Sequence, residues 1–132
     1  MSAPFIVIRT FTVKEGKLEG FKEFLPEFFK FIAANEPRLL AINAYVNDDG
    51  TEASFVSVHP DAESMEHHEK VAHEQIERAR KQFLNDTTSV QLYGEPSAGI
   101  VQKTKQLEAS GIPLTMKPEH LGGFTRLGET AR

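Results

Sequence analysis

The sequence predicts an α+β domain, with elements in the order strand, helix, strand, strand, helix, strand over about the first 95 residues. Three observations support this class. Residues 4–13 are rich in β-branched and aromatic side chains, as in a strand. Apolar residues then recur at helical intervals from Leu18 to Ile32. Finally, Asn47-Asp48-Asp49-Gly50 separates two short apolar runs, which is typical of a hairpin.

The first helix is expected to begin at Leu18, after the turn around Gly16. Pro26 lies inside the apolar stripe, so we expect a kink or a short break there. The helix should end before Pro37, since a residue that precedes proline avoids helical backbone angles. Strands over 39–46 and 53–59 then flank the Asp-Gly turn.

The second helix is expected to begin after Asp61, a residue type that caps helix N-termini. Its apolar residues form one stripe from Met65 to Phe83, which predicts a single continuous helix. Asp86-Thr87 should end this element, and Ser89–Tyr93 reads as the fourth strand of the sheet.

A C-terminal extension follows residue 96. Ser97 can cap a short helix, and Gly111 can supply the left-handed conformation that ends it. Residues 112–116 alternate as a strand, and Pro113 favours a sheet edge. We therefore divide the chain into a domain over 1–96 and an extension over 97–132, which should pack on its own or a partner subunit.

Composition excludes several classes of protein. The chain has 132 residues, a net charge of −4 and no basic run, which argues against a nucleic-acid partner. Lysines are scattered, so a helix lying on a membrane surface is not expected. Cysteine is absent, which excludes disulfides and thiolate chemistry. Nothing resembles a signal peptide or a membrane span, and we expect a cytoplasmic location.

Alternation along the strands separates two sets of side chains. The set predicted to lie under the helices is Ile6, Ile8, Leu40, Ile42, Ala44, Val46, Val56, Val58, Val90 and Leu92. The set predicted on the opposite, open face is Phe5, Val7, Arg9, Phe11, Val13, Asn43, Tyr45, Phe55, Ser57, His59, Gln91 and Tyr93. An open face of this mixed character predicts a homodimer joined through its sheets, with a cavity between sheet and helices or between subunits.

The element order resembles the ferredoxin-like βαββαβ unit of dimeric α+β barrels. The amino-acid sequence of residues 4–95 resembles that of the antibiotic biosynthesis monooxygenase family. The segments that carry this resemblance are Phe5–Ile8 with Phe11–Lys17, the phenylalanine helix ending at Glu36-Pro37, Val56–Asp61, and the pair His68 and His73.

The resemblance implies a barrel dimer. In active members of this family, O2 oxygenates small phenolic or quinol substrates, often without metal or flavin, while other members degrade haem. The haem-degrading members use a tryptophan on the second helix and an asparagine on the first strand. This chain has no tryptophan, and Arg9 stands at the comparable strand position, so that route is not expected here.

Five histidines raise the question of a metal site. On one continuous helix, His68 and His73 would point about 140° apart and could not meet on one ion. His67 should point to solvent. We therefore predict neither a metal nor another cofactor.

His68 and Arg9 are the candidate catalytic residues. His68 borders the apolar stripe, where a neutral imidazole can take a proton from a phenol. Arg9 can stabilise the developing anion. The alternatives are a hydrogen-bonded core histidine, and an arginine in an edge position or a cross-subunit salt bridge. The candidate substrate-binding residues are Asn43, Tyr45, Ser57, His59, Phe11, Phe55 and His73.

The expected activity is cofactor-independent monooxygenation of a small aromatic substrate that resembles a quinol or phenol. Two alternatives stay open. One is a non-catalytic dimeric barrel that binds a hydrophobic small molecule, and the other is a structural or stress-associated dimer with a filled sheet face.

Overall fold

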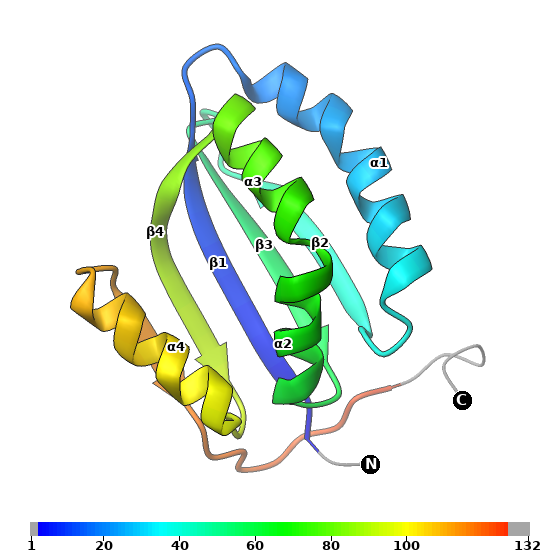
Figure 1. Ribbon diagram of the computed structural model, residues 1–132, viewed down its shortest axis with the longest axis vertical. Coiled ribbons are helices and arrows are strands. Elements are labelled where there is room, and N and C mark those ends of the chain that lie inside the picture. Colours follow the sequence, from blue (N-terminus) through cyan, green and yellow to red (C-terminus); the bar gives the residue numbers. More distant parts are fainter. Residues whose placement is uncertain (1–2, 127–132) are drawn as a thin grey trace.

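The computed structural model describes residues 3–126 as one five-stranded sheet with its helices on one face (Figure 1). The strands are β1 (Phe5–Val13), β2 (Ala41–Val46), β3 (Glu52–His59), β4 (Leu84–Tyr93) and β5 (Leu114–Lys117). The helices are α1 (Leu18–Asn35), α2 (Ala62–Val71), α3 (His73–Gln82) and α4 (Ala98–Ala109). Residues 1–2 and 127–132, which include Gly128 of the predicted extension, lie outside the described residues.

The strand order is β2-β3-β1-β4-β5. The central strand β1 pairs antiparallel with both β3 and β4, and β2 pairs antiparallel with β3. This arrangement is the ferredoxin-like βαββαβ unit, so the predicted α+β class is confirmed. The short strand β5 adds to the free edge of β4 in parallel. Helix α4 and β5 thus form the helix and edge strand expected after residue 96.

Local signals in the sequence are found where they were expected. Asp61 accepts a hydrogen bond from the Ser64 N–H at 3.0 Å, and Ser97 accepts one from the Ile100 N–H at 3.2 Å, so both are N-caps. Gly50 in the β2–β3 hairpin has a φ of 75°, which glycine adopts without strain.

Two helical details differ from expectation. Helix α1 continues through Pro26 without a break. The predicted second helix is divided at Ala72 into α2 and α3. Ala72 is completely buried against the side chains of Phe28 and Ile32, and neither glycine nor proline marks the division, so the periodicity alone does not reveal it.

The predicted orientation of β1 and β3 is wrong. In the register, Arg9 lies opposite Phe55 and Val7 lies opposite Ser57. The side chains of Phe5, Val7 and Phe11 are 1%, 7% and 3% exposed and face the helices. The residues on the opposite face are Ile6, Ile8, Val56 and Val58, which are only partly buried. Prediction was correct for Ile42, Val90 and Leu92, which do face the helices.

Three hydrophobic clusters fill the space between sheet and helices. One contains Phe5, Val90 and Leu92 together with Ile100 of α4, which is fully buried. The other two are dominated by phenylalanines, and Phe55 packs at 5.8–6.2 Å between ring centroids against Phe11, Phe21 and Phe28. Helix α4 therefore packs into the same core as the rest of the chain. Within residues 3–126, the helices are too short or too polar to traverse a lipid bilayer.

Candidate active site

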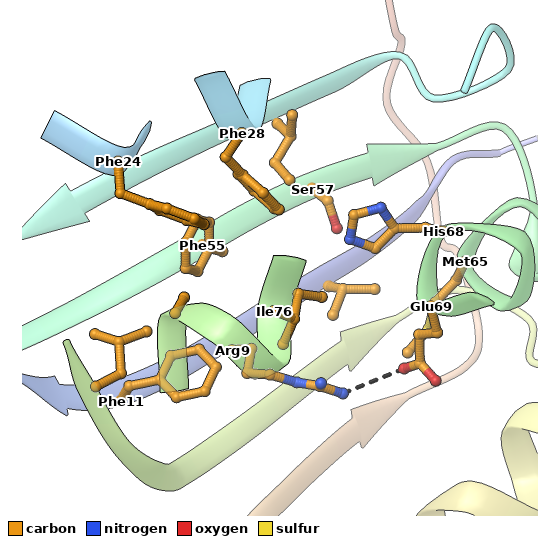
Figure 2. A pocket seen from close by; sticks show the side chains of 14 residues that line it. Arg9, Phe11, Phe24, Phe28, Phe55, Ser57, Met65, His68, Glu69 and Ile76 are labelled. Carbon is orange, nitrogen blue, oxygen red and sulfur yellow. Dashed lines mark hydrogen bonds and ion pairs between the residues drawn. The ribbon is translucent and has the colours of Figure 1, made fainter. Parts of the chain in front are cut away.

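A cavity lies between the sheet and helices α1, α2 and α3 (Figure 2). About 650 Å³ is empty, which includes the part open to solvent. Its lining consists of Val7, Arg9, Phe11, Phe24, Phe28, Ile42, Phe55, Ser57, Met65, His68, Glu69, Ile76, Ala79 and Leu84. Ten of these 14 side chains are apolar, so the four polar ones determine what chemistry the cavity supports.

His68 is the most distinctive polar residue of the cavity. Its Nδ1 lies 2.8 and 3.0 Å from the two carboxylate oxygens of Glu36. The side chain of Glu36 is 2% exposed and that of His68 is 12% exposed. A carboxylate oxygen only accepts hydrogen bonds, so this contact assigns the Nδ1 proton to the imidazole. In the neutral ring, Nε2 is then an acceptor.

The chain positions Glu36 through the end of α1. Glu36 is the C-cap residue, and its backbone N–H donates to the Ile32 carbonyl at 2.9 Å. Pro37 then prevents further helix. The carboxylate is consequently fixed beside α2, where it meets His68. The imidazole of His68 points toward the space beside Phe28, Phe55 and Ile76 (Figure 2).

Arg9 enters the cavity from the middle of β1. Its Nη2 lies 3.3 Å from Oε1 of Glu69 on α2 (Figure 2). The other oxygen of Glu69 accepts a hydrogen bond from Lys103 of α4. The side chains of Arg9 and Glu69 are 28% and 17% exposed, so this chain of charges is partly shielded from water.

His59 lies behind the cavity wall and has no exposed surface. Hydrogen bonds join its Nδ1 to Ser64 Oγ at 2.8 Å and its Nε2 to Ser57 Oγ at 3.2 Å. Burial, and to a smaller extent the neighbouring His68, lowers the pKa of His59 from 6.5 to about 3. His59 is therefore neutral at physiological pH, and it holds the Ser57 hydroxyl in place beside the cavity.

The structure brings together part of the predicted site. Arg9, Phe11, Phe55, Ser57 and His68 all line the cavity. The remaining candidates do not: His59 is behind Ser57, Asn43 and Tyr45 are exposed on the open face, and His73 is exposed at the start of α3. Asn43 and Tyr45 do lie on the predicted open face, and they were grouped with Arg9 and Ser57 because the predicted orientation of β1 and β3 was inverted.

Two acidic residues were missed as site residues. Glu36 was predicted only as the end of a helix, and its burial depends on the contact with His68 of α2. Glu69 was not among the candidate site residues. The phenylalanines Phe24 and Phe28 were also not among the candidates; they pack in the core, and their rings line the cavity.

Metal-ligating residues do not converge in the part of the chain that the structure describes. No group of three or more histidine, aspartate or glutamate side chains within residues 3–126 is arranged to hold an ion.

Solved structures share this fold. MupZ from Pseudomonas fluorescens has a TM-score of 0.73 at 18% identity, covering 95% of this chain and 96% of its own. A putative antibiotic biosynthesis monooxygenase from Chloroflexus aurantiacus has a TM-score of 0.54 at 13% identity, covering 67% and 88%. Another structure described as an antibiotic biosynthesis monooxygenase has a TM-score of 0.57 at 18% identity, covering 67% and 94%.

These likenesses define the fold class. The resemblance to antibiotic biosynthesis monooxygenases is confirmed at the level of the fold. MupZ matches over nearly the whole chain, so its match includes most of the extension beyond residue 96. No protein-family model matches this sequence, and no curated protein matches it.

Proposed function

We propose that this chain is a member of the antibiotic biosynthesis monooxygenase family and a cofactor-independent monooxygenase of a small aromatic substrate. The observation that carries the proposal is the Glu36–His68 pair at an apolar cavity. A carboxylate that orients a histidine, with the second ring nitrogen facing an apolar space, is the arrangement of a general base. The rest of the cavity is lined largely by phenylalanine and other apolar side chains, against which a flat aromatic ring can pack.

In the proposed reaction, Nε2 of His68 takes the proton of a phenol or quinol hydroxyl. The resulting anion is electron-rich, and the substrate itself supplies the electrons that reduce O2. One oxygen atom enters the substrate as a carbonyl in place of two hydrogens, and the other leaves as water. Glu36 stabilises the imidazolium that forms, because its carboxylate already accepts the Nδ1–H.

Arg9 is the candidate for stabilising the negative charge of the substrate. Its guanidinium carries five N–H donors, and Glu69 occupies one side of it. The cavity lining is mostly apolar, so a fixed cation there acts on a developing anion more strongly than it does in solvent.

Oxygen uptake by metal-stripped protein tests this proposal, with a panel of hydroquinones and anthrone-like phenols and a correction for autoxidation. We expect saturable uptake. His68→Gln should lower kcat by about 100-fold or more, the range for loss of a general base. Glu36→Gln should lower kcat about 10- to 100-fold with little change in KM, as for loss of a group that orients another. The pH profile of kcat should also change in Glu36→Gln.

His67→Gln is the matched control, because His67 is exposed on the same helix and does not line the cavity. It should retain wild-type uptake. Full activity in His68→Gln would remove His68 from the role of base. No uptake above background with any substrate would contradict the oxygenase proposal.

A second candidate function is non-catalytic binding of a hydrophobic small molecule. The ten apolar side chains of the cavity favour it. In that case aromatic compounds bind, as measured by calorimetry, while oxygen uptake stays at background and His68→Gln changes affinity only slightly.

A further inference from the structure

A second hollow adjoins the cavity, between α2, β4 and the C-terminal helix α4. About 790 Å³ is empty, which includes the part open to solvent. Its lining consists of Arg9, Met65, Glu69, Val90, Leu92, Ile100, Lys103, Thr104, Gln106, Leu107 and Ser110. Arg9, Met65 and Glu69 also line the cavity described above, so these three residues form the wall between the two spaces.

Cationic side chains outnumber anionic ones in the lining of this hollow. Arg9 and Lys103 are cationic, and Glu69 is the anionic residue among the lining side chains. Glu69 already uses one oxygen for Arg9 and the other for Lys103. Its carboxylate is therefore shared by the two cations, and one positive charge remains in excess.

Both cations keep donors for a further anion. A lysine ammonium has three N–H donors and an arginine guanidinium has five, and each has one hydrogen bond to Glu69. Lys103 is 47% exposed and Arg9 is 28% exposed, so solute can reach them. The floor below them is apolar, since Val90, Leu92 and Ile100 are fully or almost fully buried.

We propose that this second hollow is a subsite for a carboxylate of the ligand, and that the protein selects aromatic acids over their neutral analogues. The ring occupies the cavity beside His68, and the carboxylate passes Met65 to reach Arg9 and Lys103. This assignment rests on the proposed function in one respect, namely that the aromatic ring of the ligand lies in the cavity beside His68. It gives the extension a role, because Lys103 belongs to α4.

Binding of two matched probes, 2-naphthoate and the neutral 2-naphthamide, tests the subsite by isothermal titration calorimetry. We expect naphthoate to bind about five- to tenfold more tightly at low salt, and the preference to shrink as salt is added. Lys103→Met should reduce the preference to near one. Glu69→Gln should instead tighten naphthoate binding several-fold, because it removes the carboxylate that repels the anion.

Lys105→Met is the matched control, because Lys105 is exposed on the same helix and lines neither space. It should keep the preference. Equal affinity for the two probes, or a preference that Lys103→Met leaves intact, would overturn the subsite. Absence of binding by either probe would overturn it together with the ring site. A preference for naphthoate, together with no oxygen uptake for any phenol of the panel, would support the subsite and contradict the oxygenase proposal.

Discussion

The two inward histidines differ because their partners differ. His59 is surrounded by hydroxyl groups, from Ser57 and Ser64, which satisfy a neutral ring. His68 faces the carboxylate of Glu36, a partner that also accepts from an imidazolium. The ring centroids are 5.9 Å apart, and the charge of a protonated His68 would lower the pKa of His59. The serine partners of His59 are close to it in the sequence, whereas Glu36, the partner of His68, is distant along the chain and becomes its neighbour only in the fold.

The buried neutral state of His59 predicts an acid-sensitive fold. Its pKa is lowered to about 3 in the folded state, chiefly by burial and then by His68, with Asp61 opposing and Arg38 adding to the shift. Below pH 6.5 the unfolded chain binds a proton that the folded protein does not, so stability falls as pH falls from 6.5 toward 3. From pH 7 to pH 5 this group alone should cost about 2 kcal/mol in the free energy of unfolding.

Urea denaturation at several pH values measures this dependence in wild type and in His59→Gln, which does not titrate. The variant should show a shallower loss of stability between pH 7 and pH 5, whatever its stability at pH 7. His67→Gln, which changes an exposed histidine, should keep the wild-type slope. Identical slopes in wild type and His59→Gln would contradict the assignment of a neutral His59.

At the scale of elements, local chemistry explains the hairpin, the helix caps and the element order. It does not explain which face of β1 and β3 lies toward the helices. Both faces of these strands are largely apolar: Ile8 and Val56 lie on one, Val7 and Phe55 on the other. The polar residues Arg9 and Ser57 made the true inner face resemble an outer one. They are inside because they line a cavity, and alternation alone cannot distinguish a cavity lining from a solvated face.

The candidate site was predictable to the extent that its residues are polar and lie on regular elements. Arg9 interrupts an apolar strand and His68 borders the apolar stripe of its helix, and both line the cavity. Glu36 and Lys103 were not predictable, because their roles depend on contacts between α1 and α2 and between α4 and α2. The hydrophobic periodicity of a helix does not predict which residues of another helix it will contact.

Helix α4 should contribute to the stability of the whole domain. Ile100 is fully buried in the cluster of Phe5, Met65 and Leu92, whereas its neighbour Val101 is 37% exposed. Ile100→Ala should lower the free energy of unfolding by about 2–5 kcal/mol, because a buried aliphatic side chain is lost and a cavity remains.

Val101→Ala is the matched control and should cost less than about 1 kcal/mol. Urea denaturation followed by circular dichroism measures both variants. One transition is expected, since α4 shares a core with the sheet. Equal, small effects of the two substitutions would contradict an integral α4 and indicate an appendage that unfolds separately.

At the scale of the molecule, the open face of the sheet is the principal unexplained surface. The four described helices all lie on the other face (Figure 1). The open face carries Ile6, Ile8, Val56 and Val58 at its centre, and Tyr45, 62% exposed, near one edge. A contiguous apolar patch on the surface of a sheet is typical of a protein interface.

We propose that a second copy of this chain covers the open face, so that two sheets pack in a dimeric α+β barrel. A two-fold interface pairs the same patch on both subunits, and a stable one buries about 800 Å² on each. Wild type should therefore be a dimer in light scattering at micromolar concentration. Ile8→Glu should be a monomer with unchanged far-ultraviolet circular dichroism, because it places two charges in the centre of the interface.

Val101→Glu introduces the same charge on α4, away from the open face, and should remain dimeric. A monodisperse wild-type monomer at micromolar concentration would contradict the dimer, as would a dimer that persists in Ile8→Glu. The cavity reaches no residue of the open face, since Ile6, Ile8, Val56 and Val58 are absent from its lining. Each subunit should thus bind ligand independently, and monomeric Ile8→Glu should retain naphthoate affinity.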